Sequence, residues 1–211
     1  MKKNIIYVVI TLLMSLVFFF ELANFYSFIA YPYLVLLLGG AGVDILSQTW
    51  LIITSLVAIT LLFATNVWQL LHLRFKKTFL KVQTLLYLVA LLFVIMLKSR
   101  GVQGINLNPL NLLTQFQESA FIVFANIVLF IPVGFLLFRR VKTLKMVVAS
   151  ATIGLIILEI SQYLLHLGIA DVADILTNLS GILLGYLGLD LLRDLGWKSR
   201  TDSSYIYFYK N

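Results

Sequence analysis

Six runs of mainly apolar residues follow one another along this chain, and they constrain its fold more than any other feature. By hydrophobic periodicity the runs cover about residues 5–23, 45–70, 79–97, 119–138, 144–166 and 172–192. A helix needs about 20 apolar residues to cross a hydrocarbon core of about 30 Å. Because that core tolerates no unpaired backbone groups, runs of this length fold as helices there. The sequence therefore predicts an all-α, polytopic membrane bundle of about six transmembrane helices.

The composition supports a bilayer environment and excludes several other classes of protein. The chain is 61% hydrophobic and only 12% charged, which leaves little material for a water-soluble domain. Its net charge of +7 comes from short basic clusters beside the apolar runs, so it does not indicate nucleic-acid binding. The absence of cysteine excludes disulfides, thiolate metal ligands and thiol nucleophiles.

Two stretches near the N-terminus need separate interpretation. The first apolar run follows Lys2 and Lys3 but lacks a small-residue cleavage site near its end, so we expect a retained helix and not a signal peptide. The segment near 28–41 contains an apolar core of only about 13 residues, bracketed by Pro32 and a glycine cluster. This length is short for a span and favours an interfacial or re-entrant segment.

The positions of the basic residues predict the orientation of the chain. Four clusters fall on one side if there are six spans, namely Lys2 with Lys3, Arg74 to Lys81, Arg139 to Lys145, and Arg193 to Arg200. The positive-inside rule then places both termini in the cytoplasm and the loop at about 98–118 outside, together with the turn "LGIAD". Lys98 and Arg100 oppose this assignment but are outnumbered. The aromatic and basic stretch "SSYIYFYKN" is typical of an interfacial anchor.

Polar residues recur at one depth of the predicted bundle. Glu159, Gln162 and His166 share one helical face, because they are spaced i, i+3, i+7. The same spacing recurs in the next run, at Asp171, Asp174 and Asn178, and Asn126 lies at a similar depth in the fourth run. The outer loop adds Asn106, Asn108 and Asn111. Since an Asp at a span centre costs roughly 2.5–3.5 kcal/mol, such groups usually face a bundle interior or a wet cavity.

Structural explanations exist for several of these residues. Asp171 and Asp174 are in a first helical turn, where carboxylates cap free N–H groups. The amides of Asn126, Gln162 and Asn178 are also suited to hydrogen bonds between helices. Glu159 is the hardest to explain this way and is a candidate proton-accepting or cation-binding group. His166 is better explained as an interfacial side chain than as a ligand.

Small residues predict how the helices approach one another. Gly181 and Gly185 form a G-x-x-x-G pair, which is typical of close helix packing. Pro132 and Gly134, in "FIPVGF", predict a kink or loosening of the fourth span that would shape a cavity near Asn126.

Four motifs together resemble the VanZ-like membrane family: "INLNPL", "NIVLFIPVGFLL", "LEISQYLL" and "DVADILTNLSGILLGY". The resemblance covers about residues 80–193 and divides the chain into an N-terminal membrane segment (1–75), a VanZ-like transmembrane domain (76–195) and a cytoplasmic basic and aromatic tail (196–211). Characteristic family positions are occupied by Asn106, Pro109, Asn126, Pro132, Gly134, Glu159, Gln162, Asp171, Asp174, Asn178, Gly181 and Gly185. One departure is that family members often carry an Arg shortly before the first Asp, where this chain has Gly168, Ile169 and Ala170.

The resemblance implies a multi-pass protein of the bacterial cell membrane, linked to the envelope and to resistance against teicoplanin-like lipoglycopeptides. We favour a binding role, in which an outward-facing polar site recognises a lipoglycopeptide or a lipid-linked wall precursor within the lipid bilayer. The expected ligand-binding residues are Asn106, Asn126, Glu159, Gln162, Asp171, Asp174 and Asn178. Pro132, Gly134, Gly181 and Gly185 are expected to be structural.

Two other classes of function remain open. The chain could be a membrane-embedded enzyme in which Glu159, Asp171 and Asp174 act as acid and base or as ligands of a divalent cation. Against this, the sequence contains no nucleophile motif and no H-E-x-x-H motif, and we expect no cofactor. A proton-coupled carrier using Glu159 is the third possibility, although no inverted repeat is evident.

Overall fold

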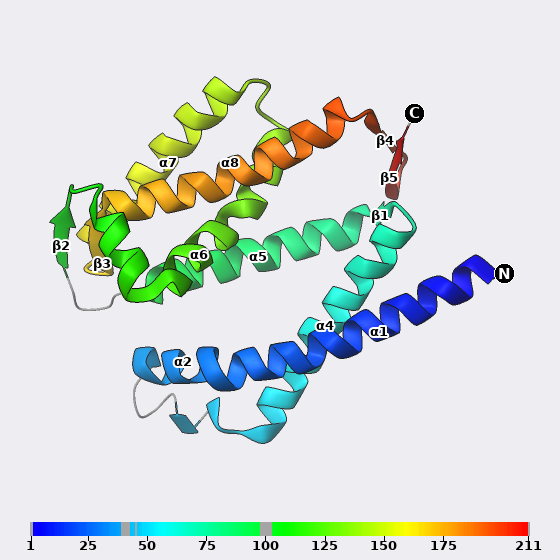
Figure 1. Ribbon diagram of the computed structural model, residues 1–211, viewed down its shortest axis with the longest axis horizontal. Coiled ribbons are helices and arrows are strands. Elements are labelled where there is room, and N and C mark those ends of the chain that lie inside the picture. Colours follow the sequence, from blue (N-terminus) through cyan, green and yellow to red (C-terminus); the bar gives the residue numbers. More distant parts are fainter. Residues whose placement is uncertain (1, 39–42, 45, 98–102, 211) are drawn as a thin grey trace. The chain divides into compact units, whose positions relative to one another are not determined.

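The computed structural model describes residues 2–38, 43–44, 46–97 and 103–210, and these residues form two compact units (Figure 1). The first unit contains residues 1–84 and 199–209, and the second contains residues 85–198 and 210–211. Among the described residues, six helices are long and apolar enough to cross a membrane, at Lys2–Ala30, Thr49–Leu71, Lys77–Ile95, Asn111–Phe138, Leu144–Leu164 and Val172–Asp194. The predicted all-α polytopic bundle is confirmed, and the predicted spans differ from these helices mainly at their ends.

The first unit begins with one long helical stretch. Helix α1 (Lys2–Phe25) passes through a π-helical turn, η1 (Tyr26–Ala30), directly into α2 (Tyr31–Leu38), and the residues at both junctions keep right-handed helical dihedrals. The segment predicted near 28–41 is helical as far as residue 38: α2 follows η1 directly and lies beyond the first candidate span, which ends at Ala30. Its interfacial or re-entrant position stays a prediction. Its glycine cluster at 39–42 lies outside the described residues. Pro32 is compatible with this path because proline is tolerated in a first helical turn.

Helix α4 (Thr49–Leu71) packs against α1 mainly through aromatic side chains. Phe18 and Phe63 stack with ring centres 4.0 Å apart, and Tyr7 meets His72 edge to face at 4.9 Å. No residue of α1 is buried within the structure, and large apolar side chains such as Leu12 and Val17 are more than half exposed. Such a surface fits a lipid environment, since lipid tails are as apolar as these side chains.

A three-stranded sheet joins the loop after α4 to the end of the chain. Its strand order is β1 (Arg74–Lys76), β5 (Tyr205–Lys210), β4 (Trp197–Thr201). Strands β1 and β5 are antiparallel, with Arg74 opposite Tyr207 and Lys76 opposite Tyr205. The stretch expected to be an aromatic anchor is thus a folded strand, an element that the sequence interpretation did not include.

The second unit contains α5 (Lys77–Leu97) from residue 85 onward, β2 (Gln103–Asn106), α6 (Asn111–Phe138), α7 (Leu144–Leu164), β3 (Gly168–Asp171) and α8 (Val172–Asp194). Its apolar core comprises Leu91, Phe130, Val147, Ala151, Leu155, Ile182 and Tyr186. Helices α6 and α8 form the most extensive packing of the unit. The long elements hold the short strands β2 and β3 together at one end of the helices (Figure 1).

Three glycines allow α6 and α8 to touch through their backbones. A Cβ atom added at Gly181 would lie only 2.1 Å from the carbonyl oxygen of Ile127, and one added at Gly185 would lie 2.1 Å from that of Ile131. On the facing helix, a Cβ at Gly134 would be 2.1 Å from the carbonyl oxygen of Ile182. The two helices therefore approach most closely at these glycines, and Gly134 takes part in the contact directly.

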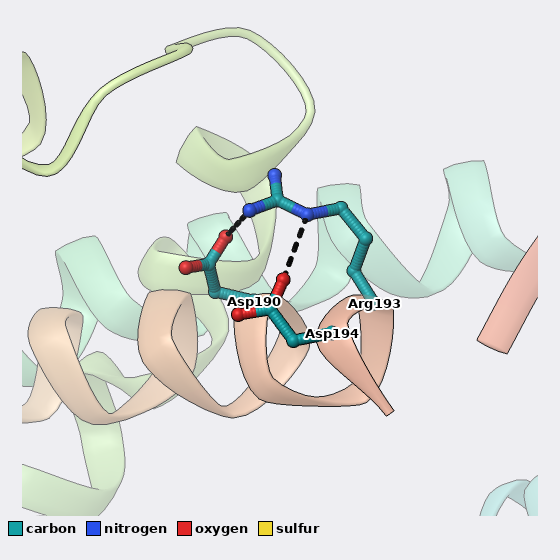
Figure 2. Close-up of polar contacts among 3 residues, drawn as sticks. All are labelled: Asp190, Arg193 and Asp194. Carbon is teal, nitrogen blue, oxygen red and sulfur yellow. Dashed lines mark ion pairs between the residues drawn. The ribbon is translucent and has the colours of Figure 1, made fainter. Parts of the chain in front are cut away.

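An ion-pair cluster closes the last turn of α8, at the end remote from β3. Arg193 contacts Asp190 at 2.5 Å and Asp194 at 3.5 Å (Figure 2). The same guanidinium lies 5.7 Å from the ring centre of Phe138. A basic residue in a last turn also complements the negative end of the helix dipole, so the cluster stabilises the helix terminus, with the small energies expected of exposed pairs.

Candidate functional site

Asp171 is the centre of the polar site, because its carboxylate collects donors from separate parts of the chain. It is the last residue of β3 and the N-cap of α8, where Oδ1 accepts the backbone N–H of Ala173 at 2.8 Å. Oδ2 accepts three side-chain amides: Asn106 Nδ2 at 3.3 Å, Asn111 Nδ2 at 2.9 Å and Gln115 Nε2 at 2.9 Å. Asp171 is only 6% exposed, so these bonds replace the water that the charge loses on burial.

Strand pairing and helix geometry explain why these amides converge. Strands β2 and β3 are parallel, and their register places Asn106 directly opposite Asp171. Asn111 begins α6, and Gln115 lies one turn later on the same face. The outer loop and the turn "LGIAD" are therefore brought side by side, at least from residue 103 onward. Gln115 was not predicted, although its i+4 spacing from Asn111 is a signal in the sequence that could have identified it.

Glu159 and Gln162 lie on the inner face of α7, as their spacing predicted. Glu159 is 4% exposed, and its Oε2 accepts the backbone N–H of Asp171 at 3.1 Å. Gln162 is also buried, and its Nε2 donates to the backbone carbonyl of Ile95 at 3.1 Å, which ties α7 to α5. Glu159 thus fixes the strand that carries the central carboxylate.

His166 has a backbone role and does not join this cluster. Its φ of +57° is left-handed, which is uncommon for a residue other than glycine. The N–H of His166 bonds the carbonyl of Tyr163, and the N–H of Leu167 bonds that of Gln162. These two bonds form a Schellman motif that ends α7 and turns the chain toward β3.

In the first turn of α8, a second carboxylate connects α8 to α6. Asp174 Oδ1 accepts Asn126 Nδ2 at 3.1 Å, and the backbone carbonyl of Asp174 accepts the hydroxyl of Thr177 at 3.0 Å. Asn178 lies a further turn along and is 5% exposed, and within the described part of the chain its Oδ1 has no hydrogen-bond partner. All seven predicted ligand-binding residues therefore lie in the second unit on β2, β3 and three helices.

Two cavities adjoin these residues. The larger has a volume of about 220 Å³ and is lined by Gln115, Glu118, Ser119, Ile122, Gln162, Leu167, Gly168, Ile169, Asp171 and Asp174. The smaller, of about 20 Å³, is lined by Val94, Ile95, Asn126, Leu129, Phe130, Leu158, Glu159, Gln162 and Asn178. The smaller volume suits a single water molecule. The site is thus a cavity with polar and apolar lining next to an inner layer of polar residues.

A break in α6 shapes the larger cavity. Ser119 has φ −157° and ψ 86°, outside the helical range, and it lines the cavity together with Glu118. We predicted a kink at Pro132, but the non-helical dihedrals in α6 lie at Ser119, 13 positions earlier along the sequence. Irregular backbone at membrane depth is tolerated where it lines a cavity, so the break is consistent with a site there.

Amide and carboxylate side chains supply the hydrogen-bonding groups of this site. Within the described ranges, no group of three or more His, Asp or Glu side chains is arranged to hold a metal ion. The partners of Asp171 are three side-chain amides and a backbone N–H, at a position where related proteins are expected to supply an Arg. Residues 168–170, which replace that Arg, form the strand that pairs with β2. The arrangement therefore presents both hydrogen-bond donors and acceptors beside a cavity.

Comparison with known proteins identifies the family. No curated protein and no solved structure is significantly similar to the chain. A family model described as VanZ/LLP1 matches residues 84–193, which is more than half of the chain. The matched region contains β2, β3 and every residue of the site described above. Together with six helices of membrane-spanning length, this match shows that the chain is a membrane protein belonging to the VanZ/LLP1 family.

Proposed function

We propose that this protein protects the bacterial envelope by recognising an amphiphile at its polar site, from the outer side of the membrane. The ligand is a lipoglycopeptide antibiotic of the teicoplanin type or a lipid-linked wall precursor. The observation that carries the proposal is the cavity of about 220 Å³, because Asp171 and Asp174 lie in its wall. Buried carboxylates and amides are costly in a membrane and usually mark a functional site.

The lining of the cavity supports an amphiphilic ligand. Gln115 presents a buried Oε1 atom that has no hydrogen-bond partner among the described residues, while its Nε2 donates to Asp171. The ligand would therefore offer a hydroxyl, amine or amide donor to that oxygen. Ile122, Leu167 and Ile169 line the same cavity, so an apolar chain entering beside the polar head would also be accommodated.

The size of the cavity limits which part of the ligand enters. Pockets for drug-sized molecules usually measure about 300–1,000 Å³, so a volume of about 220 Å³ admits a head group or one sugar and not a whole antibiotic. On this proposal the remainder of the amphiphile stays in the outer leaflet.

Antibiotic susceptibility of cells with and without the gene tests the proposal. We expect the gene to lower susceptibility to teicoplanin more than to vancomycin, because vancomycin lacks the lipid tail. Equal susceptibility to teicoplanin in both strains would contradict the proposal. If purified protein instead converted a lipid-linked substrate into product, the enzymatic alternative would replace it.

A single substitution connects the phenotype to the cavity. Glu118→Gln removes a charge from the cavity wall at an exposed side chain, so it should leave folding intact and weaken protection. Glu21→Gln makes the same chemical change at an exposed position of α1 and serves as the matched control. If both variants protected cells equally at equal protein abundance, protection would not depend on this cavity, and the proposal would be contradicted.

A further inference from the structure

The segments around the three-stranded sheet are strongly basic. Residues 72–84 and 199–209 contain five basic side chains, Arg74, Lys76, Lys77, Lys81 and Arg200, and a single acidic one, Asp202. Four of the five basic residues are exposed, with Lys77 partly buried. This surface belongs to the first unit, whereas the residues of the polar site belong to the second.

The sheet is anchored where two spanning helices end. Helix α4 ends at Leu71 and α5 begins at Lys77, so β1 occupies the short connection between two helices of membrane-spanning length. A connection of this length keeps β1 at the edge of the bilayer, close to the lipid head groups. Strand β5 pairs with β1, which holds the C-terminal strand at the same edge.

Arg74 is held in a defined orientation on the sheet. Its guanidinium carbon lies 3.7 Å from the ring centre of Tyr205 and 5.5 Å from that of Tyr207. Alternation along the strands places Lys76 on the same face, while Phe75 packs on the opposite face against Phe208 at 5.5 Å. Stacking on tyrosine leaves the N–H groups at the edge of the guanidinium for an anion.

The acidic residue of this region does not neutralise that face. Oδ1 of Asp202 accepts the backbone N–H groups of Ser204 and Tyr205, and Oδ2 accepts the hydroxyl of Tyr207. In the described part of the chain, no carboxylate forms an ion pair with Arg74. The carboxylate of Asp202 is thus used in the hairpin turn, and Lys77 donates to the backbone carbonyl of Asp202. Arg74 and Lys76 are exposed and have no ion-pair partner among the described residues.

We propose that the face of this sheet carrying Arg74 and Lys76 binds the phosphate group of an anionic phospholipid from the same membrane. The planar guanidinium of Arg74 contacts the phosphate with two N–H groups, and Lys76 adds a second positive charge. The adjacent tyrosine rings lie at head-group depth, where aromatic side chains are favoured. The bound lipid then stabilises the pairing between β1, in the α4–α5 connection, and the C-terminal strand β5.

Native mass spectrometry of the full-length protein in detergent tests this site. Phosphatidylglycerol and phosphatidylcholine are titrated separately, with Arg74→Gln/Lys76→Gln compared to wild type. A basic residue near an anionic surface contributes about a five-fold effect on binding, so the double variant should bind phosphatidylglycerol about 25-fold more weakly. Binding of phosphatidylcholine should not change.

The control variant removes the same charge from another basic loop. Arg139→Gln/Lys142→Gln lies between α6 and α7, and the proposal requires that it lose less phosphatidylglycerol binding than the sheet variant. Equal losses in the two variants would overturn the proposal, as would unchanged binding in the sheet variant. Equally tight binding of a duplex oligonucleotide at the sheet would also overturn it in favour of a nucleic-acid surface.

A conservative variant separates recognition from folding. Arg74→Lys keeps the charge but loses the planar fork, so it should weaken phosphatidylglycerol binding while the thermal unfolding temperature without added lipid stays at the wild-type value. Full binding by Arg74→Lys would show that net charge is sufficient and would overturn the assignment of Arg74 as the phosphate contact.

Discussion

Replacing Gly181 with alanine should separate α6 from α8 and disturb the polar site at the same time. The added Cβ would lie 2.1 Å from the carbonyl oxygen of Ile127, whereas ordinary contacts of this kind begin at 3.4 Å. The helices must therefore move apart by roughly 1 Å, and overpacking of this type costs about 1–3 kcal/mol. Asn126, the neighbour of Ile127, would then lose its 3.1 Å bond to Asp174, at a further cost of about 1 kcal/mol.

Gly188→Ala is the matched control, because Gly188 lies in the same helix and a Cβ there meets nothing within 4 Å. Alanine in an open helical position usually gains about 0.5–1 kcal/mol over glycine. We therefore expect Gly181→Ala to lower the unfolding temperature in detergent and Gly188→Ala to leave it equal or higher. If both variants had the same unfolding temperature, the close backbone contact between α6 and α8 would be refuted.

Three further predictions concern single side chains. Asp171→Asn replaces one acceptor oxygen with an NH2 donor that must face the amide donors or the backbone N–H of Ala173, so it should cost about 1–3 kcal/mol of stability, measured by thermal unfolding. A wild-type unfolding temperature would contradict the geometry. His166→Gly should stabilise the protein by about 1 kcal/mol, because its φ of +57° strains an L-residue, whereas His166→Ala should give no gain in the same assay. Hydrogen bonds from the backbone of Tyr205 and Ser204 hold the pKa of Asp202 below its usual value of 3.8. Because the pKa is lower in the folded state than in the unfolded state, the ionised carboxylate stabilises the fold at pH values above the unfolded-state pKa. Protection of these two amides from hydrogen exchange should therefore be lost as the pH falls through the folded-state pKa. Asp202→Asn should remove this pH dependence, and a persistent dependence would assign it to another group.

The transmembrane helices were predictable because a single physical requirement, the burial of backbone polar groups in lipid, fixes both their length and their composition. The same reasoning predicted that Glu159, Asp174 and Asn126 would reach one depth. Which of these side chains bond to each other, such as Asn126 to Asp174, could not be predicted, because it depends on how α6 and α8 cross. That crossing depends in turn on the glycine contacts.

The short strands could not be predicted from local patterns. "QGIN" and "GIAD" are too short to show alternation, and they pair because α6 and α7 bring them together. A kink or loosening of the fourth span at Pro132 stays a prediction, whereas the non-helical dihedrals of α6 lie at Ser119, which no local sequence rule marks. The direct passage from α1 through η1 into α2 was missed, since Pro32 at the start of α2 does not stop a helix.

The pairing of β1 with β5 has a consequence for biosynthesis. Arg74 is synthesised before four of the helices of membrane-spanning length, whereas Tyr207, its partner, is synthesised after all of them. The two strands can meet only if α5, α6, α7 and α8 together return the chain to the side of the membrane on which β1 was left. Formation of this sheet therefore follows the insertion of the last helix, and a chain in which any one of these helices failed to insert would leave β1 and β5 on opposite sides.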